Sequence, residues 1–158
     1  MAATKLAAIG DAIEAAFIAA LASQSPAVPV YRGGGQWLTS AADPDFVVIG
    51  HDGSRDVTAA PPSAELQEPA GQGGGWRTAR ADIPFAVISQ SGDTDMAARR
   101  ARAEAILSLL DAPLRLPVNA LGGIVTFGWI SSVAAFEDQA GAGAVARYAA
   151  VYHAEYNV

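Results

Sequence analysis

The last third of the chain alternates between two kinds of side chain from Ala144 to Val158, and this alternation constrains the fold most strongly. Successive side chains of a β-strand point to opposite faces of a sheet. One face carries Ala144, Ala146, Tyr148, Ala150, Tyr152, Ala154 and Tyr156, and the other carries Val145, Arg147, Val151, His153 and Glu155. Residues Ile124 to Glu137 precede it, separated by Gly141-Ala142-Gly143. The pattern predicts a long β-hairpin, which needs other elements to cover its apolar face.

Two amphipathic helices are available to cover that hairpin. The first is predicted from about Ala3 to Ser23, and the second from about Asp95 to Leu110. Apolar residues three or four positions apart fall on one helical face; these are Leu6, Ile9, Ile13, Phe17 and Leu21 in the first helix, and Met96, Ala103, Ile106, Leu107 and Leu110 in the second. The turn 91–94 is expected to cap the second helix, and Asp111-Ala112-Pro113 to end it.

Three further extended segments complete the predicted sheet. Val28 to Tyr31 contains Pro29, so it is at best an edge strand. Asp45 to Gly50 is short and β-branched, as in a buried strand, and Trp76 to Gln90 is a longer strand. The predicted order is α-β-β-loop-β-α-β-β. We therefore expect an α/β (α+β) fold: one mixed or antiparallel sheet of about five strands, two helices on one face, and a single domain over 1–158.

The segment from about 51 to 75 loses most large apolar residues and is rich in glycine and proline. A loop of this length in a compact domain is usually functional or disordered. We expect it to project from the body. Deleting Pro61 to Gly74 is then expected to leave a folded domain that assembles less well.

Composition excludes several classes of function. The net charge is −6 and the pI about 4.7, which disfavours sequence-independent binding of nucleic acid. The chain has no cysteine, so it has no disulfide and no thiolate metal site. No apolar run approaches the roughly 20 residues that a membrane-spanning helix needs.

No motif predicts catalysis or a cofactor. Gly141 to Ala146 fits a dinucleotide-binding G-x-G-x-x-A pattern, but the helix and strand that this motif needs cannot follow in so short a remainder. Neither histidine has an obvious second metal ligand. We therefore expect His51 to be solvated and His153 to be a paired surface residue. Asp93 and Asp95 are explained by helix capping. We expect no enzyme, no metal and no cofactor.

Aromatic and basic residues are the candidates for a subunit interface. The arginines of the second helix could bind DNA phosphates or acidic groups of a neighbouring copy. The negative net charge of the chain favours pairing with a neighbouring copy over binding to DNA. Simple solvation of that helix face is favoured over either of these two interpretations taken alone. Trp76, Trp129 and Tyr148 are candidate interface anchors, with core packing the equal alternative for the two in strands. The predicted interface residues are Trp76, Arg77, Arg80, Arg99, Arg100, Arg102 and Arg147.

From Asp82 onward the chain resembles the tail terminators and related tail-completion (head–tail joining) proteins of long-tailed, siphovirus-like bacteriophages. The extended segment Ile83 to Gly92 is followed by the helix RRARAEAILSLLDA at 99–112, by Leu121-Gly122-Gly123, and by the hairpin EDQAGAGAVARYAAVYHAEY at 137–156. The resemblance covers about half of the chain well. What recurs in such proteins is the order of elements rather than fixed residues.

The resemblance implies a structural protein of the virion, assembled in the host cytoplasm. It implies a homohexameric ring that stacks on the last ring of the tail tube protein, stops polymerisation and joins a head completion or connector protein, with DNA able to pass through the lumen. It carries over no cofactor and no catalytic residue.

Three alternatives stay open at this stage. Another head–tail connector or tail-completion subunit, including a tube-like protein, would have similar elements. A small α/β enzyme or ligand-binding domain would need convergent polar groups in an apolar pocket, which the sequence does not offer. An acidic interaction module of a secretion or toxin-delivery machine is the third.

Overall fold

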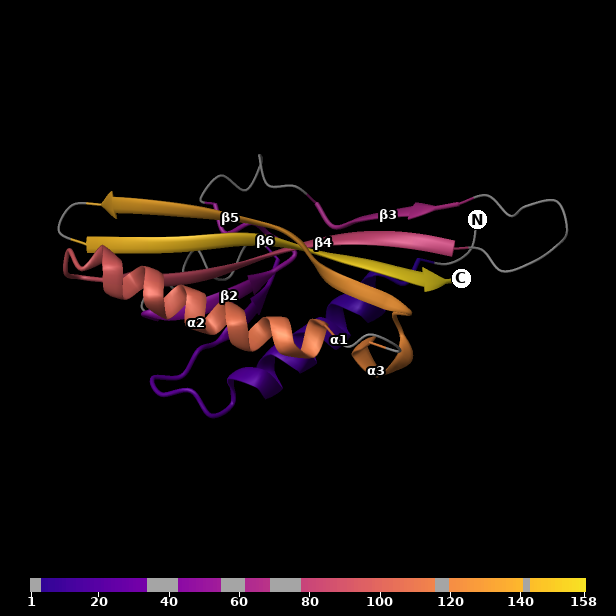
Figure 1. Ribbon diagram of the computed structural model, residues 1–158, viewed down its shortest axis with the longest axis horizontal. Coiled ribbons are helices and arrows are strands. Elements are labelled where there is room, and N and C mark those ends of the chain that lie inside the picture. The colour runs from indigo at the N-terminus through magenta and orange to yellow at the C-terminus, as the bar shows by residue number, and fades with distance from the viewer. Residues whose placement is uncertain (1–3, 34–42, 55–61, 69–77, 116–119, 141–142) are drawn as a thin grey trace, which may run out of the picture.

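A computed structural model describes residues 4–33, 43–54, 62–68, 78–115, 120–140 and 143–158, which form one mixed sheet with helices packed against it (Figure 1). The strands follow the order β1-β2-β4-β6-β5, and β3 pairs with β4 beside β2. Only the β1–β2 pair is parallel. The elements are α1 (Leu6–Leu21), β1 (Val30–Arg32), β2 (Asp45–Ile49), β3 (Ala64–Gln67), β4 (Thr78–Ser91), α2 (Met96–Leu114), α3 (Ala120–Gly123), β5 (Phe127–Ala140) and β6 (Gly143–Asn157). The predicted mixed α/β fold is confirmed, with the strand β3 added and with α3, in which Leu121 and Gly122 have left-handed backbone angles, forming a turn rather than a regular helix.

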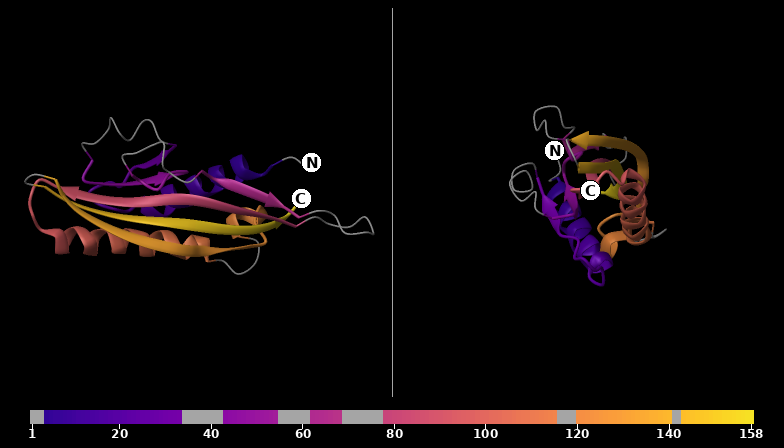
Figure 2. Two further views of the ribbon diagram at one scale, coloured as in Figure 1. Left: turned by 90° about the horizontal axis from the view of Figure 1, so that it is seen from above. Right: turned by 90° about the vertical axis from the view of Figure 1, so that its left-hand side faces the viewer.

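The predicted C-terminal hairpin is confirmed and forms the long axis of the molecule (Figure 2). Residues with even numbers from Ala144 to Tyr156 are all buried in β6, and those with odd numbers are only partly buried. β6 pairs along its whole length with β4 on one side and with β5 on the other. The two-residue period of the sequence is therefore the period of burial.

Both helices cover the same face of this sheet, as expected, and lie below β4 and β6 in Figure 1. Ile9, Ile13 and Phe17 of α1 and Ile106 and Leu110 of α2 are fully buried. They share one apolar cluster with alternate residues of β4 and with the tyrosines of β6. The Phe17 ring meets the Phe85 ring edge to face, with centroids 5.2 Å apart.

Helix α2 is displaced from its predicted ends. Its N-cap is Asp95, whose carboxylate accepts a hydrogen bond from the Ala98 amide at 3.0 Å, so the helix begins one residue later than expected. It continues to Leu114, past the predicted stop at Pro113. Leu114 is fully buried in the core. Burying a leucine stabilises by about 2 kcal/mol, which offsets most of the cost of a proline in the last turn.

Residues 51–75 differ most from the prediction of a projecting, unstructured loop. β3 lies in this segment and pairs with β4 from Ala79 to Asp82. His51 and Gly53 are buried. Gly53, at φ +75°, lies so close to the sheet that a Cβ would stand 2.7 Å from the Cβ of Ala86. The small size of Gly53 allows this backbone to pack closely on the sheet. Residues 55–61 and 69–75 lie outside the described residues.

The described residues cover the second face of the sheet only in part. Phe46, Val48, Ala86 and Ile88 form a small buried cluster there, next to the segment 51–54 that packs on β4 and β6. Pro84 lies where β4 passes from its partner β3 to its partner β2, so its missing N–H interrupts neither pairing. Its carbonyl accepts a hydrogen bond from the Gly50 amide at 2.7 Å.

Candidate subunit interface

Two of the predicted interface residues, Trp76 and Arg77, lie outside the described residues. The other five are divided between two places. Arg99, Arg100 and Arg102 belong to α2, and Arg80 and Arg147 lie on the second face of the sheet, on β4 and β6. The structure therefore does not gather the predicted arginines into one patch.

Arg99 and Arg102 converge on a buried carboxylate of the same chain. The Asp45 side chain is 3% exposed, accepts a hydrogen bond from Ser89 Oγ at 2.6 Å, and lies 2.9 Å from Arg102 Nε and 3.9 Å from Arg99 Nη1. Arg102 also donates to Gln24 Oε1 at 3.0 Å, just after α1. This network ties α2 to β2, to β4 and to the end of α1. A buried carboxylate needs such partners, so these two charges stabilise the subunit itself.

The remaining described arginines of the predicted set also have partners within the chain. Arg80 lies 3.2 Å from Glu68 and 3.7 Å from Glu155, and Arg100 lies 3.1 Å from Glu137. These pairs are half-exposed and contribute little to stability. Because acidic groups neutralise them locally, they do not form a cationic surface for DNA phosphates. Their role at an interface stays a prediction.

Arg147 covers the segment that follows β2. Its Nη1 donates to the Asp52 carbonyl at 2.7 Å, and its guanidinium lies 3.9 Å from the centroid of the Phe136 ring. Burial raises the pKa of the Asp52 carboxyl, but hydrogen bonds from Ser54 and the charge of Arg147 outweigh it, so the pKa is lowered overall. The cation therefore joins the segment 51–54, β6 and β5.

A second carboxylate fixes β3 against the helical side of the molecule. Glu65 Oε2 accepts from the backbone amide of Lys5 at 3.1 Å and from the hydroxyls of Thr4 and Tyr156. Burial raises the pKa of the Glu65 carboxyl, but these hydrogen bonds lower it by a larger amount. The pKa therefore lies below its ordinary value of 4.5. Glu65 thus satisfies the amide of Lys5, the N-cap residue of α1, while Thr4 Oγ1 accepts from the next amide, that of Leu6, at 3.2 Å.

The sequence did not reveal how exposed β5 is. Residues 131–139 are all exposed, and the strand presents Phe127, Trp129, Val133 and Phe136 at 50%, 44%, 49% and 46% exposure. For Trp129 the sequence left an interface role and core packing equally open. It lies at the surface, where its ring contacts His153. Tyr148, for which the same two roles were open, is in the core. The sequence signal for the exposure of β5 was the lack of a regular alternation of apolar and polar residues in FGWISSVAAFEDQA, residues 127–140.

The expectation that His51 is solvated is wrong, because this residue is buried, at 4% exposure. Nδ1 of the buried His51 accepts from the Gly53 amide at 3.0 Å, and His153 lies 2.6 Å from Asp82. No cluster of three or more histidine, aspartate or glutamate side chains suited to a metal occurs among the residues that the structure describes. No helix in that same part of the chain is long and apolar enough to cross a membrane.

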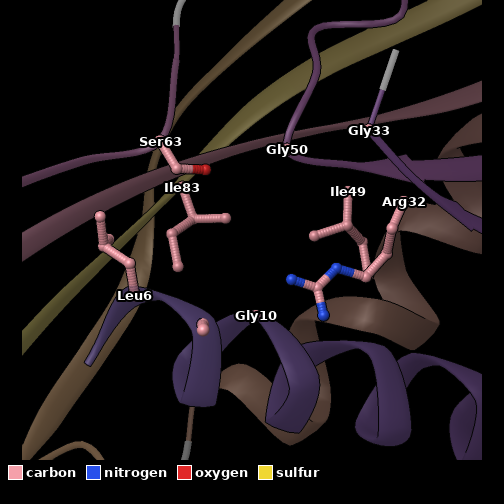
Figure 3. Close-up of a pocket in the computed structure, with 9 residues that line it drawn as sticks. Leu6, Gly10, Arg32, Gly33, Ile49, Gly50, Ser63 and Ile83 are labelled. Atoms are coloured by element: carbon pink, nitrogen blue, oxygen red, sulfur yellow. The ribbon is translucent and has the colours of Figure 1, made fainter. Parts of the chain in front are cut away.

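A pocket of about 250 Å³ lies between α1 and the ends of β1 and β2 (Figure 3). Its walls are mainly aliphatic or glycine, and Arg32 is the one ionisable residue among its described lining residues: Leu6, Ala7, Gly10, Arg32, Gly33, Ile49, Gly50, Ser63 and Ile83. The Arg32 guanidinium lies over Gly10, where a Cβ would be 2.5 Å from Nη2, and it pairs with Asp11 and Glu14. The described lining offers no acid–base pair for catalysis.

Comparison with known proteins shows the fold. No protein-family model matches the sequence, and no curated protein is similar enough to match it. Among solved structures, a chain from the virion of a native gene transfer agent (GTA) particle matches with a TM-score of 0.59 and 14% identity, covering 99% of this chain and 100% of that one. A second solved structure matches with a TM-score of 0.46 and 19% identity over 92% and 95% of the two chains, which is too weak to carry an argument.

Proposed function

We propose that this protein is a structural subunit of a virion, and specifically a tail terminator of a long-tailed phage or phage-like particle. Six copies would form a ring at the head-proximal end of the tail. The ring would stop polymerisation of the tail tube protein and provide the surface that a head completion or connector protein joins, with DNA passing through its lumen.

The observation that carries this proposal is the fold shared with a virion chain along essentially the full length of both proteins. At 14% identity that likeness establishes architecture only, but it agrees with the independent resemblance of residues 82–156 to tail terminators. Two separate comparisons, one of sequence pattern and one of backbone, thus favour the same class of protein.

The polar groups of the chain support a structural role. The described arginines of the predicted interface each pair with an acidic or backbone group of the same chain, and the described pocket lining brings no acid and base together. A catalytic site would gather such groups in a cavity. Here they join helices and strands.

A tube-capping experiment tests the proposal. Purified tail tube protein of the same particle is polymerised with and without this chain, and tube length and end labelling are measured by electron microscopy. A terminator shortens the tubes and labels one end, whereas an acidic protein of equal size does neither. Labelling of assembled head connectors, without binding to tubes, would instead favour another head–tail joining subunit. Absence of both would refute the proposal.

A further inference from the structure

The outer edge of β5 is the least protected part of the described structure. Fourteen residues form this strand, and no described strand pairs with its outer side. Natural edge strands are commonly blocked by lysine, proline, a β-bulge or a covering element. β5 has no lysine or proline, its one irregularity lies between Ile130 and Ser132, and its only charges, Glu137 and Asp138, lie near its end. An edge with this composition invites pairing with another strand.

The opposite edge of the sheet is stepped, because β3 lies directly beside β4 whereas β1 is separated from β4 by β2. Strand registers show the level of the step. β3 begins opposite Asp82 and β2 ends opposite Phe85, so the step falls at Ile83 and Pro84, and Pro84 pairs with Val151 of β6.

β5 has an irregularity at the same level. Its register shifts between Ile130 and Ser132, and Ser132 is the residue that pairs with Val151. A β-bulge bends a strand. The bend in β5 and the step in the opposite edge therefore lie on the same row of the sheet, so one edge has the outline needed to follow the other.

Strand direction and side chains also match. β5 runs antiparallel to β6, β6 to β4, and β4 to β3, so β5 of one copy would meet β3 of a similarly oriented copy in an antiparallel pair. The row Leu66–Arg80–Glu155–Phe127 crosses the sheet. It begins and ends with exposed apolar residues, Leu66 at 66% and Phe127 at 50%.

We propose that β5 of one copy pairs with the stepped β3/β1 edge of the next copy, joining the sheets head to tail. This inference rests on the proposed ring, because a cyclic assembly needs two different surfaces that meet. The facing edge has four residues in β3 and three in β1, so the paired length is about 24 Å, and with a sheet about 10 Å thick the contact covers about 240 Å² on each copy. That area is too small for a stable contact between two isolated copies, so the pairing depends on ring closure, which repeats it around the assembly.

Matched lysine substitutions test the contact. Phe127→Lys and Leu66→Lys place a charge on the two proposed edges, and Ile18→Lys places one on an exposed apolar residue of α1, at 54% exposure, as the control. Sedimentation velocity should show rings for the wild type and for Ile18→Lys, and smaller species for the other two. Phe127→Lys combined with Leu66→Glu in one chain should restore rings.

Cysteine cross-linking detects the contact directly, so its result does not depend on whether a substitution destabilises the subunit. Because the native chain has no cysteine, only introduced cysteines can form disulfides. Leu66→Cys combined with Phe127→Cys, or Ala64→Cys combined with Trp129→Cys, should give a ladder of disulfide-linked multimers on oxidation, since each pair shares one row of the sheet and directly opposed residues of paired strands bring their Cβ atoms close to bonding range. Each single variant should stay uncrosslinked.

The outcomes separate the two proposals. A wild-type protein that remains monomeric contradicts the ring and with it the edge pairing. Rings that survive both lysine substitutions, together with no ladder from either cysteine pair, contradict the edge pairing alone. Dimers from Phe127→Cys by itself would mean that β5 pairs with β5, which also overturns the head-to-tail arrangement.

Discussion

Replacing Asp45 with asparagine should destabilise the subunit more than any exposed charge removal. The substitution keeps the size of the side chain and removes the charge that faces Arg102 and Arg99. Removing one partner of a fully buried ion pair costs 3–5 kcal/mol. Because the two arginine side chains remain 23% and 22% exposed, water recovers part of that loss, and we expect about 2 kcal/mol.

The expected effect is measurable by thermal and urea unfolding. For a chain of this length, about 2 kcal/mol corresponds to a decrease of Tm by about 4–8 °C. Asp11→Asn is the matched control, since Asp11 also pairs with an arginine but its side chain is 73% exposed. The control should change the free energy of unfolding by less than about 0.5 kcal/mol.

A double-mutant cycle with Arg102→Leu identifies the cause. The loss in the double variant should be smaller than the sum of the single losses by at least about 1 kcal/mol, because each single change leaves the other group unpaired. Additive losses, or an Asp45→Asn protein as stable as the control, would refute the view that this network fixes α2 on the sheet.

Three other perturbations have defined outcomes. Glu65→Gln should lower the free energy of unfolding at neutral pH. Because folding lowers the pKa of Glu65, its carboxylate stabilises the folded state above the unfolded value of 4.5, and this contribution is lost as the pH falls through the folded pKa. At that low pH the two proteins should unfold alike. Burial raises the pKa of Tyr152 to about 12, so its phenol should ionise near pH 12 in an ultraviolet titration, and the stability it contributes should be lost between pH 10 and 12; ionisation near pH 10 in the folded protein would contradict the burial. Gly128→Val should cost about 1–3 kcal/mol in urea unfolding, because a Cβ there would lie 2.5 Å from Tyr152 Cζ, whereas Gly92→Ala, which meets nothing within 4 Å, should be neutral.

Regular periodicity allowed most of the fold to be predicted. The alternation in β6 and the helical stripes of α1 and α2 each follow from one burial direction repeated many times, so single exceptions do not hide them. The end of α2 was wrong because a local rule about Pro113 was outweighed by the burial of Leu114, which depends on the tertiary core.

The described parts of the segment 51–75, residues 51–54 and 62–68, could not be predicted, because the forces that order them act over long sequence separations. β3 is four residues long and is held by β4 and by the bonds of Glu65 to Lys5 and Tyr156. None of these partners is visible in the local sequence. Deleting 61–74 therefore removes β3, and should destabilise the domain itself.

The interface residues stay predictions, but the structure shows which of them have partners within the chain. Arginines were the natural candidates, yet whether an arginine meets a carboxylate of its own chain, as Arg102 meets Asp45, depends on the three-dimensional neighbours. Trp129 and Phe136 are exposed because β5 is the last strand of the sheet, and strand order is not encoded in any single segment.

A cryo-electron microscopy reconstruction of the assembled wild-type protein is the most direct test. We predict a closed six-membered ring in which the sheet continues from one copy to the next through β5. A population of single subunits, or a ring whose β5 edges face solvent, would contradict that prediction.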